Sequence, residues 1–487
     1  MMKKTILLSC LTAMVLFAAP VNNNNEKGQV TVQKQIEQLE KQVKLQQKYL
    51  KYSIYEIRKL KKELKEVKKR QKISRNIYFK KIAPMLANNH LYWNLGLRST
   101  FDFVDYKTKS GKKYTNNILS NRVDLKGVYK VDDGLKTVVE IEANNIYGMN
   151  NINRTSPYNN ISWVASETPD DTTLRVKKAY FLWHFGDGYM LSFGRRDSVD
   201  GFPANLATGD EEGSPLAIIG NLEFDGFAFR AGSNPLSKIF PKAKEWNSWI
   251  KICGGRAYSD AVGKWDTSGL PPYAKNGLSN TNFLIALIYP YVGEKFEIGG
   301  MAVSAWNMKG YNTYADLMAN NMEDLGNYSA GTMMLKIKGL SNKSLYWRKS
   351  LAYILVAGDW TNPSSGKEML GSTSNKFGKA IWLGLDMPGI SANDRWGAML
   401  TMGSKYWKNL AFAEDRVTGS LSSVRGTGFE TYYHRKLRKA LYLDTSMTLM
   451  DYKHSGSDGF FGVSGSPNQP DYVKRAFNIR VDIKYNF

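Results

Sequence analysis

Hydrophobic and polar side chains alternate strictly along the last segment of the chain. One face would carry Phe477, Ile479, Val481, Ile483, Tyr485 and Phe487, and the other Asn478, Arg480, Asp482, Lys484 and Asn486. A period of two residues is that of a β-strand, and about 10 residues is the length at which a tilted strand crosses a lipid bilayer. The segment therefore predicts a long strand with one apolar and one polar face. A strand of a soluble sandwich also alternates, but it is rarely this long.

The same pattern recurs along most of the chain. We predict strands at 91–103, 119–130, 135–146, 173–185, 188–196, 223–231, 248–258, 281–291, 296–306, 328–338, 347–359, 376–387, 395–407, 427–436, 441–452 and 475–487. This gives about 16 strands, within a range of 14 to 18 because boundaries read from one sequence are soft. The predicted fold class is therefore all-β.

Short and long connections alternate between these strands. The short ones lie at 131–134, 186–187, 292–295, 339–341, 388–390 and 437–440, and the long polar ones at 147–172, 197–222, 259–280, 307–327, 408–426 and 453–474. Short turns at one rim and long loops at the other are typical of a transmembrane antiparallel β-barrel. An even strand number then places both ends of the barrel domain, residues 85–487, on the short-turn side. Such barrels carry aromatic girdles at both membrane interfaces, for which we expect Tyr92, Trp93, Trp183, Tyr289, Trp360, Trp407 and Tyr452.

The first nineteen residues have the composition of a secretory signal peptide. Lys3 and Lys4 precede a short apolar run that ends at Ala19, and Asn22 begins an abruptly polar stretch. This run is shorter than the roughly 18 apolar residues of a membrane helix. Residues 1–19 are therefore expected to direct export and to be removed.

Residues 30–75 predict a coiled coil. Ile36, Val43, Leu50, Ile57 and Leu64 fall at one heptad position, and Leu39, Leu60 and Val67 at the other. Five to six such heptads favour association of helices, and polar residues in the seam can set the register. We expect a periplasmic coiled coil that makes the chain a homo-oligomer, with a trimer favoured.

Basic charge is concentrated in this same segment. The chain has a net charge of +23, and 17 Lys or Arg against five Glu lie between residues 33 and 81. A solvated oligomerisation stalk explains this pattern. The alternative is a stalk that also contacts an anionic surface, such as a cell-wall polymer or phospholipid head groups. Because the chain is exported, we do not expect a nucleic-acid partner.

A more specific string lies between residues 174 and 231. It comprises Leu174–Tyr180 (LRVKKAY), Leu191–Arg196 (LSFGRR), Asp200–Pro203 (DGFP), Gly213–Gly220 (GSPLAIIG) and Glu223–Phe227 (EFDGF). This string resembles a family of uncharacterised porin-like outer-membrane proteins of Gram-negative bacteria, with Phe202 standing where the family pattern has a second Pro. The terminal Phe487 resembles the assembly signal of outer-membrane barrels. The resemblance implies an export signal, a short coiled coil and a long barrel in the outer membrane, in contact with its lipid, and it implies nothing about the solute.

The loop after Arg196 is the third long loop when the connection at 104–118, between the first two predicted strands, is counted as the first. In general porins, which this barrel resembles in strand number, the third loop folds inward and narrows the channel. The candidate constriction residues are Asp197, Asp200, Asp210, Glu211 and Glu212, and the candidate lumen-wall residues that would face them are Arg122, Lys126, Arg480 and Lys484. Acids opposite bases would set the ion preference of the pore. The alternative is that these acids belong to a solvated external loop.

Enzymatic chemistry is not expected. His90, His184, His434 and His454 are scattered, with no nucleophile-elbow motif around them, and we interpret each as a loop or rim residue. Two Cys and four His predict no metal site, and no motif predicts a cofactor. The sequence therefore predicts a porin for passive diffusion of small hydrophilic solutes or ions. The alternative is a structural anchor whose basic coiled coil tethers the outer membrane to the cell wall or to a periplasmic partner.

Overall fold

The structure is a computed structural model of the 487-residue chain. It describes residues 90–147, 174–196, 201–209, 216–221, 224–261, 271, 273–391, 393–411 and 416–486, together with scattered positions between 37 and 65. Contacts divide the chain into two compact units, residues 1–89 and residues 90–487.

In the first unit, the described positions between 37 and 65 are helical. Val43 and Ile57, which occupy the predicted heptad seam, have exposed side chains in the single chain. Helical geometry at these positions agrees with the heptad pattern, but the coiled coil itself stays a prediction. The segment 1–19 lies outside the described residues.

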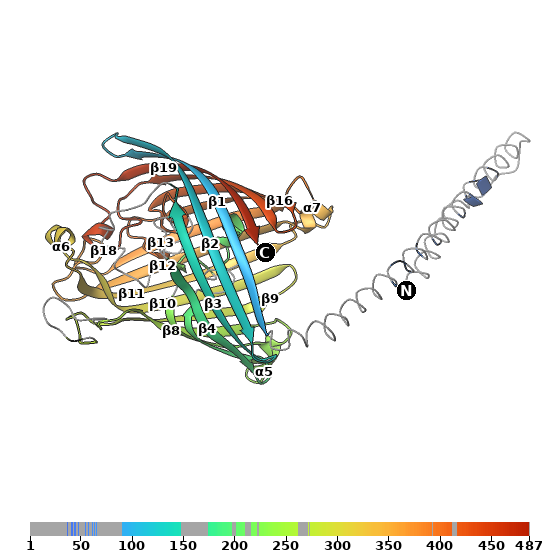
Figure 1. Cartoon of the computed structure of the whole chain (residues 1–487), viewed down its shortest axis with the longest axis horizontal. Coiled ribbons are helices and arrows are strands. Elements are labelled where there is room, and N and C mark those ends of the chain that lie inside the picture. Colours follow the sequence, from blue (N-terminus) through green and yellow to red (C-terminus); the bar gives the residue numbers. More distant parts are fainter. Residues whose placement is uncertain are drawn as a thin grey trace, which may run out of the picture. The chain divides into compact units, whose positions relative to one another are not determined.

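The second unit is a closed antiparallel β-barrel (Figure 1). Sixteen strands form its wall in the described part of the chain: β1 (Leu91–Thr108), β2 (Lys113–Lys130), β3 (Leu135–Ile146), β4 (Arg175–Phe185), β5 (Tyr189–Arg196), β7 (Phe224–Ala231), β8 (Trp249–Tyr258), β9 (Thr281–Val292), β10 (Phe296–Tyr311), β11 (Glu323–Lys338), β12 (Leu351–Pro363), β13 (Lys376–Pro388), β14 (Arg395–Gly403), β16 (Gly426–Arg438), β17 (Leu441–Tyr452) and β19 (Val473–Asn486). Each strand pairs with its sequence neighbour, and β1 pairs with β19 to close the ring. The wall thus has no free edge strand.

Each predicted strand overlaps one observed strand, so the strand count of 16 is confirmed. Several boundaries were wrong. Strands β1 and β2 extend to residues 108 and 113, so a tight turn replaces the predicted loop between them. Residues 345–348 form the short helix α7 (Leu345–Arg348) rather than the start of a strand. Strand β14 ends at Gly403, because the chain then turns into the barrel instead of continuing along its wall.

The two faces of the wall differ as the period-two pattern predicts. On β19, Ile479 and Ile483 point outward and are exposed, whereas Asn478, Arg480 and Asp482 point inward and are buried. The same division holds along the other strands, which leaves a broad band of exposed apolar side chains around the barrel. An exposed apolar surface of this extent is expected to be covered by an apolar environment.

Aromatic side chains are split between the faces. Tyr92, Trp93, Trp183 and Trp360 lie exposed on the outside, as girdle residues should. The girdle prediction was wrong for the other three. Tyr289 and Tyr452 sit at inward-facing positions of their strands, and Trp407 lies in a loop that packs inside the barrel; all three are buried.

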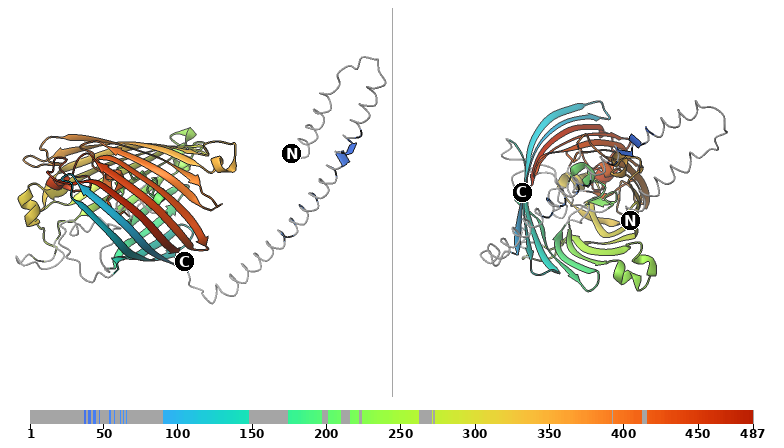
Figure 2. Two further views of the ribbon diagram at one scale, coloured as in Figure 1. Left: turned by 90° about the horizontal axis from the view of Figure 1, so that it is seen from above. Right: turned by 90° about the vertical axis from the view of Figure 1, so that its right-hand side faces the viewer.

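The long loops carry short elements of their own. These are α4 (Asn205–Thr208), β6 (Gly220–Asn221), α6 (Tyr314–Ala319), β15 (Leu410–Ala411), η4 (Leu421–Ser423), β18 (Phe461–Gly462) and η5 (Val463–Gly465), while α5 (Ser233–Ser237) and η3 (Pro241–Ala243) lie at the short-turn rim. None of the helices in the described residues is long and apolar enough to cross a membrane. The end-on view in Figure 2 shows loop segments inside the ring of strands. One contact there is the parallel pairing of β15 with β6, which joins two loops far apart in sequence.

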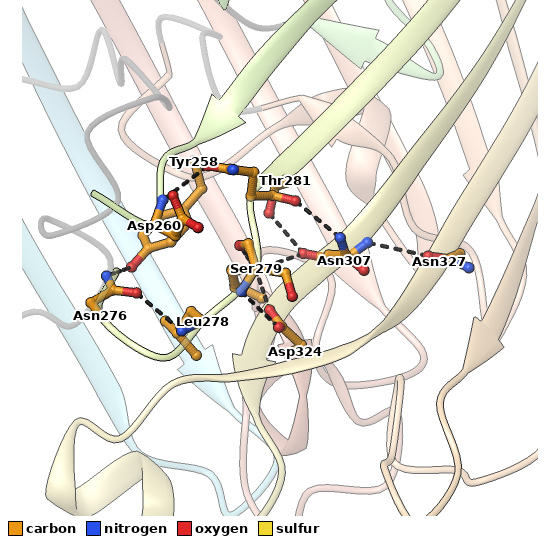
Figure 3. A network of polar contacts seen from close by, with 11 residues as sticks. Tyr258, Asp260, Asn276, Leu278, Ser279, Thr281, Asn307, Asp324 and Asn327 are labelled. Atoms are coloured by element: carbon orange, nitrogen blue, oxygen red, sulfur yellow. Dashed lines mark hydrogen bonds and ion pairs between the residues drawn. The ribbon is translucent and has the colours of Figure 1, made fainter. Parts of the chain in front are cut away.

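A polar network fixes one loop end to the wall (Figure 3). The Lys309 ammonium donates to the carbonyl oxygens of Ser279 and Asn307, at 2.6 and 3.0 Å, and forms an ion pair with Asp324. Asn307 Nδ2 in turn donates to the carbonyl oxygen of Asn280 at 3.1 Å. These bonds satisfy backbone carbonyls that leave the strand ladder where β9 begins.

Candidate functional site

The interior of the barrel has two chemically different parts. We call the inner faces of β17, β19, β1, β2, β3 and β4 the charged wall, and the inner faces of β9–β14 the loop-packed wall. Ionic side chains dominate the charged wall. Buried apolar side chains dominate the loop-packed wall, including Leu287, Met301, Val303, Met334, Leu355, Trp382 and Met399. The charged wall is the candidate functional site, because it presents polar groups to the lumen.

An ion-pair cluster closes the charged wall where the two ends of the barrel meet. The register places Asp102 opposite Arg480 and Thr100 opposite Asp482. The Arg480 guanidinium donates through Nε and Nη2 to the two Asp102 carboxylate oxygens, at 2.9 and 3.0 Å. Asn478 adds a third donor to Asp102, and the Thr100 hydroxyl donates to Asp482 at 2.6 Å. Bidentate geometry of this kind is the strongest form of the Arg–carboxylate pair.

A second ladder of charges runs across β2, β3 and β4. Lys178 lies 2.7 Å from Glu140, which is also 3.9 Å from Lys126. Lys177 lies 2.7 Å from Glu142. A β-bulge between residues 140 and 141 turns the consecutive Lys177 and Lys178 to the same inner face. Bases and acids therefore alternate along this wall.

The loop between β5 and β7 enters the barrel. Its described residues Leu216, Ala217, Ile218 and Ile219 are fully buried. Phe202 packs edge-on against the ring of Tyr353 on β12, with centroids 4.9 Å apart, and the Lys336 ammonium lies 3.8 Å from its centroid. Both partners face inward, so Phe202 is an interior anchor of the loop.

Helix α4 of this loop is bonded to the opposite wall. The Nε2 atom of His434 on β16 lies 2.7 Å from the carbonyl oxygen of Leu206, and its Nδ1 atom lies 2.8 Å from Asp444. Both ring nitrogens therefore lie within hydrogen-bond distance of an oxygen. Lys484 donates to the carbonyl oxygen of Thr208 and lies 3.1 Å from Asp444. Gly209 ends the helix with a φ of 70°, which glycine adopts without strain.

A small cavity separates α4 from the wall. It is lined by Ala207 and Thr208 from the loop and by polar residues of β16, β17 and β19, and its volume is about 20 Å³. A space of this size holds about one water molecule. Arg416, from the loop after β14, reaches the same cavity and pairs with Glu430 on β16. At the height of α4 in the barrel, the loop and the strands β16, β17 and β19 are therefore almost in contact.

Two buried cations hold the loop after β14 in place. Burial, and secondarily the neighbouring Arg425, lowers the pKa of Lys408 to about 7. Its ammonium donates to the carbonyl oxygens of Ser457 and Gly459, at 3.3 and 2.6 Å. Burial also lowers the pKa of Arg425 to about 10, and its guanidinium donates to the carbonyl oxygens of Trp407, Ser455 and Gly465. These cations bind together the loops that follow β14 and β17.

The structure places the residues expected at the site as follows. Arg122, Lys126, Arg480 and Lys484 all lie on the inner face. Lys484 contacts the infolded loop, whereas Arg480 is engaged by Asp102 and Lys126 lies near Glu140. The five acids Asp197, Asp200, Asp210, Glu211 and Glu212, and the terminal Phe487, lie outside the described residues.

Sequence reasoning missed several wall residues. Asp102, Glu140, Glu142 and Asp444 pair with the wall cations, and each sits at an inward position of a predicted strand. The period-two alternation of the sequence already indicates that these four residues face inward. The expectation that His434 is a rim or loop residue was wrong, since it lies on β16 and holds α4.

Comparison with known proteins yields one family and several structural likenesses. No curated protein matches the chain. Among solved structures, OprB of Pseudomonas putida is similar with a TM-score of 0.46 at 10% identity, covering 84% of this chain and 97% of that one. The anion-selective porin of Comamonas acidovorans is similar with a TM-score of 0.44 at 10% identity, covering 82% and 100%. The trimer form of OmpT of Vibrio cholerae is similar with a TM-score of 0.43 at 10% identity, covering 82% and 99%.

The family is set by the sequence of the barrel itself. Residues 112–487, which run from the second strand to the last residue, match the family described as "Protein of unknown function (DUF3373)". This match covers more than half of the chain. The protein therefore belongs to that family.

Proposed function

We propose that the protein is an outer-membrane porin, which lets small hydrophilic solutes or ions diffuse passively along the charged wall. One observation carries the proposal. A closed barrel has exposed apolar side chains around its outside and a ladder of ion pairs on part of its inside. Ionic groups on the outer face at mid-membrane would cost about 2–4 kcal/mol each. This barrel keeps its ionic ladder on the inner side, away from the lipid.

In this proposal the loop after β5 forms the constriction. Its buried segment lies inside the barrel, and α4 contacts Lys484 and His434 of the wall. Asp197, Asp200, Asp210, Glu211 and Glu212 belong to the same loop. They would face the bases Arg122, Lys126, Arg480 and Lys484 and set the ion preference.

The test is single-channel conductance of the refolded full-length protein in a planar lipid bilayer, with a salt gradient across it. Discrete steps that scale with bulk salt are expected of a water-filled pore, and the reversal potential gives its charge preference. Absence of steps, from protein whose heat-modifiable gel mobility shows that it is folded, would refute the porin.

A charge-reversal variant tests the constriction separately. Replacing Asp210, Glu211 and Glu212 with Lys should shift the reversal potential toward anions. Reversing Asp132 and Asp133 in the short turn between β2 and β3 is the matched control, since it changes a similar charge at the other rim. An unchanged reversal potential in the first variant would remove these acids from the pore.

Residues 1–19 would direct export in this proposal, and residues 30–75 would form a periplasmic coiled coil that joins the chains into trimers. Their support is the apolar run, the heptads and the helical positions between 37 and 65. Deleting residues 26–81 should leave the conductance of a single barrel intact and dissociate the oligomer, as measured by light scattering in detergent.

A tether is the second candidate function, and the concentration of basic charge between residues 33 and 81 favours it. The stalk would then bind an anionic cell-wall polymer. Cells that carry the deletion would keep the pore but lose envelope integrity, measured as leakage of a periplasmic enzyme. Intact envelopes in those cells would contradict the tether.

A further inference from the structure

A pocket of about 320 Å³ opens on the inner side of the short-turn rim. Its lining includes Arg230 of β7 and Trp249 of β8, together with His184, Asn234, Asn247 and Ser248. The rim here is built by the β4–β5 turn and by the segment that contains α5, near the label α5 in Figure 1. Among the described residues that line this pocket, none carries a carboxylate.

Arg230 is held flat by an aromatic stack. Its guanidinium carbon lies 4.7 Å from the centre of the Trp249 ring. Trp249 in turn stacks on Tyr289 of β9, with centroids 4.2 Å apart and an angle of 13° between the planes. A guanidinium fixed on an aromatic face loses little conformational freedom when it binds, and its remaining N–H donors stay available.

Arg230 differs from the paired cations of the interior. Lys177, Lys178 and Arg480 each lie within 3 Å of a carboxylate oxygen. For Arg230 the described residues provide neither an ion pair nor a side-chain hydrogen bond, and its Nε atom is buried without a partner among them. A half-buried cation whose Nε is shielded from water has lost part of its hydration, and no counter-ion among the described residues offsets that loss. An anion in the pocket would supply the missing partner.

The surroundings add further positive charge and further donors. The register places the buried Lys251 opposite Arg230 on the neighbouring strand. The carboxylate of Asp187, in the β4–β5 turn, accepts a hydrogen bond from Asn234 at 2.8 Å. The Asn247 amide donates one hydrogen to the carbonyl oxygen of Val292, at 3.3 Å, and has a second that can donate to an oxyanion, as can a ring N–H of His184.

We propose that this pocket binds the phosphate or carboxylate group of a small anionic solute, with the Arg230 fork as the main contact and Trp249 as its support. Binding itself does not depend on conductance. That the pocket lies at the mouth of a solute path rests on the porin function proposed above. If both hold, small oxyanions are one class of solute.

The test is isothermal titration calorimetry of the folded full-length protein in detergent at constant ionic strength, with inorganic phosphate and acetate in separate titrations. Saturable binding of at least one is expected, and Arg230→Gln should weaken it at least tenfold. Arg230→Lys keeps the charge but loses the fork, so a smaller weakening is expected. Arg195→Gln is the matched control, because Arg195 is paired with Asp225 on the outer face at 2.8 Å; it should bind like the wild type.

Three results would overturn the proposal: no saturable binding of either anion, equal binding by Arg230→Gln, or an equal loss in Arg195→Gln. If Arg230→Gln does not fold, Arg230→Lys and Trp249→Leu decide in its place, since both should weaken binding in folded protein. Addition of the bound anion to one side of a bilayer then tests the pore. Binding without any conductance would retain the site and refute the porin.

Discussion

The charged wall and the loop-packed wall are both made of antiparallel strands, but their inward-facing side chains differ in chemistry. On the charged wall, the inward positions of β1, β2, β3 and β19 are ionic and pair with one another. On the loop-packed wall, inward positions such as Leu355 and Trp382 are apolar and fully buried. Loop side chains cover them, including Leu216, Ile219, Trp407, Leu421 and Phe461. The strand ladder alone therefore does not decide what fills the barrel.

The difference follows from the cost of leaving each wall in contact with water. An exposed apolar wall loses roughly 25 cal/mol for each Å² that could be buried, so the long loops fold onto it. An ionic wall would lose hydration if apolar loops covered it. Apart from α4, which is bonded to Lys484 and His434, the buried loop residues named above pack on the loop-packed wall, and we expect solute to pass along the rest of the charged wall.

The largest expected effect lies on the charged wall. Asp102→Ala leaves the Arg480 guanidinium without its carboxylate in a site where Asp102 is 0% exposed. Loss of one partner of a buried ion pair typically costs about 3–5 kcal/mol. The free energy of unfolding in detergent and urea should fall by that order. Asp102→Asn is the control, since the amide oxygen still accepts from Arg480, and it should cost less. Equal stability of Asp102→Ala and wild type would show that water satisfies this wall.

The loop-packed wall should respond through packing instead. Phe461→Ala removes a ring that is 0% exposed and lies 5.6 Å from the ring of Tyr328. Such truncations cost about 3 kcal/mol or more, and the cost should appear as release of the 453–472 loop. Hydrogen exchange read by mass spectrometry should rise in this loop but not in β1 or β19. Phe193→Ala, on the exposed outer face, is the control and should leave the loops unchanged.

These two variants touch parts of the fold that differ in how far the sequence predicts them. Strand positions and inward-facing residues follow from alternation, as on β19, where alternation alone places Arg480 and Lys484 on the inner face. Alternation also predicts that Asp102 and Glu140 face inward. Their ion-pair partners cannot be predicted without the register between neighbouring strands. That register is set by turns and bulges, such as the bulge at Glu140 that turns both Lys177 and Lys178 inward.

The loops were less predictable for a physical reason. Trp407 and Tyr452 were expected at a membrane interface, because a sequence does not distinguish an outward aromatic residue from one that meets an infolded loop. The contact between β6 and β15 joins residues about 190 positions apart, and no local sequence pattern predicts it. His434 likewise gained its role only from the position of α4.

A pH effect should sharpen the comparison further. Because burial lowers the Lys408 pKa to about 7, the docked loop binds a proton less readily than the released loop, where an ordinary Lys titrates near 10.5. Between these two pH values the released state carries more protons, so docking should strengthen as pH rises above 7. The gain is at most about 1.4 kcal/mol per pH unit. Hydrogen exchange of the 404–411 segment, corrected for intrinsic rates, should slow between pH 6.5 and 8.5, and Lys408→Met should remove this trend. A trend of the opposite sign would contradict the lowered pKa of the buried Lys408.

The smallest effect is expected on the outer face, where Arg195 and Asp225 pair at 2.8 Å with both side chains about half exposed. This pair lies at the long-loop ends of β5 and β7, where water and salt reach and screen it, so it should contribute about 0–1 kcal/mol. Asp225→Asn should therefore change the unfolding free energy by less than the Asp102→Asn control does. The measurement is the urea midpoint in detergent at low and at high salt, with the exposed Asp132 of the short turn, changed to Asn, as the matched control. A large loss in Asp225→Asn would mean that the surroundings of this pair are apolar. The cost of leaving a cation unpaired would then be large at any position, and it would no longer set the charged wall apart from the rest of the barrel.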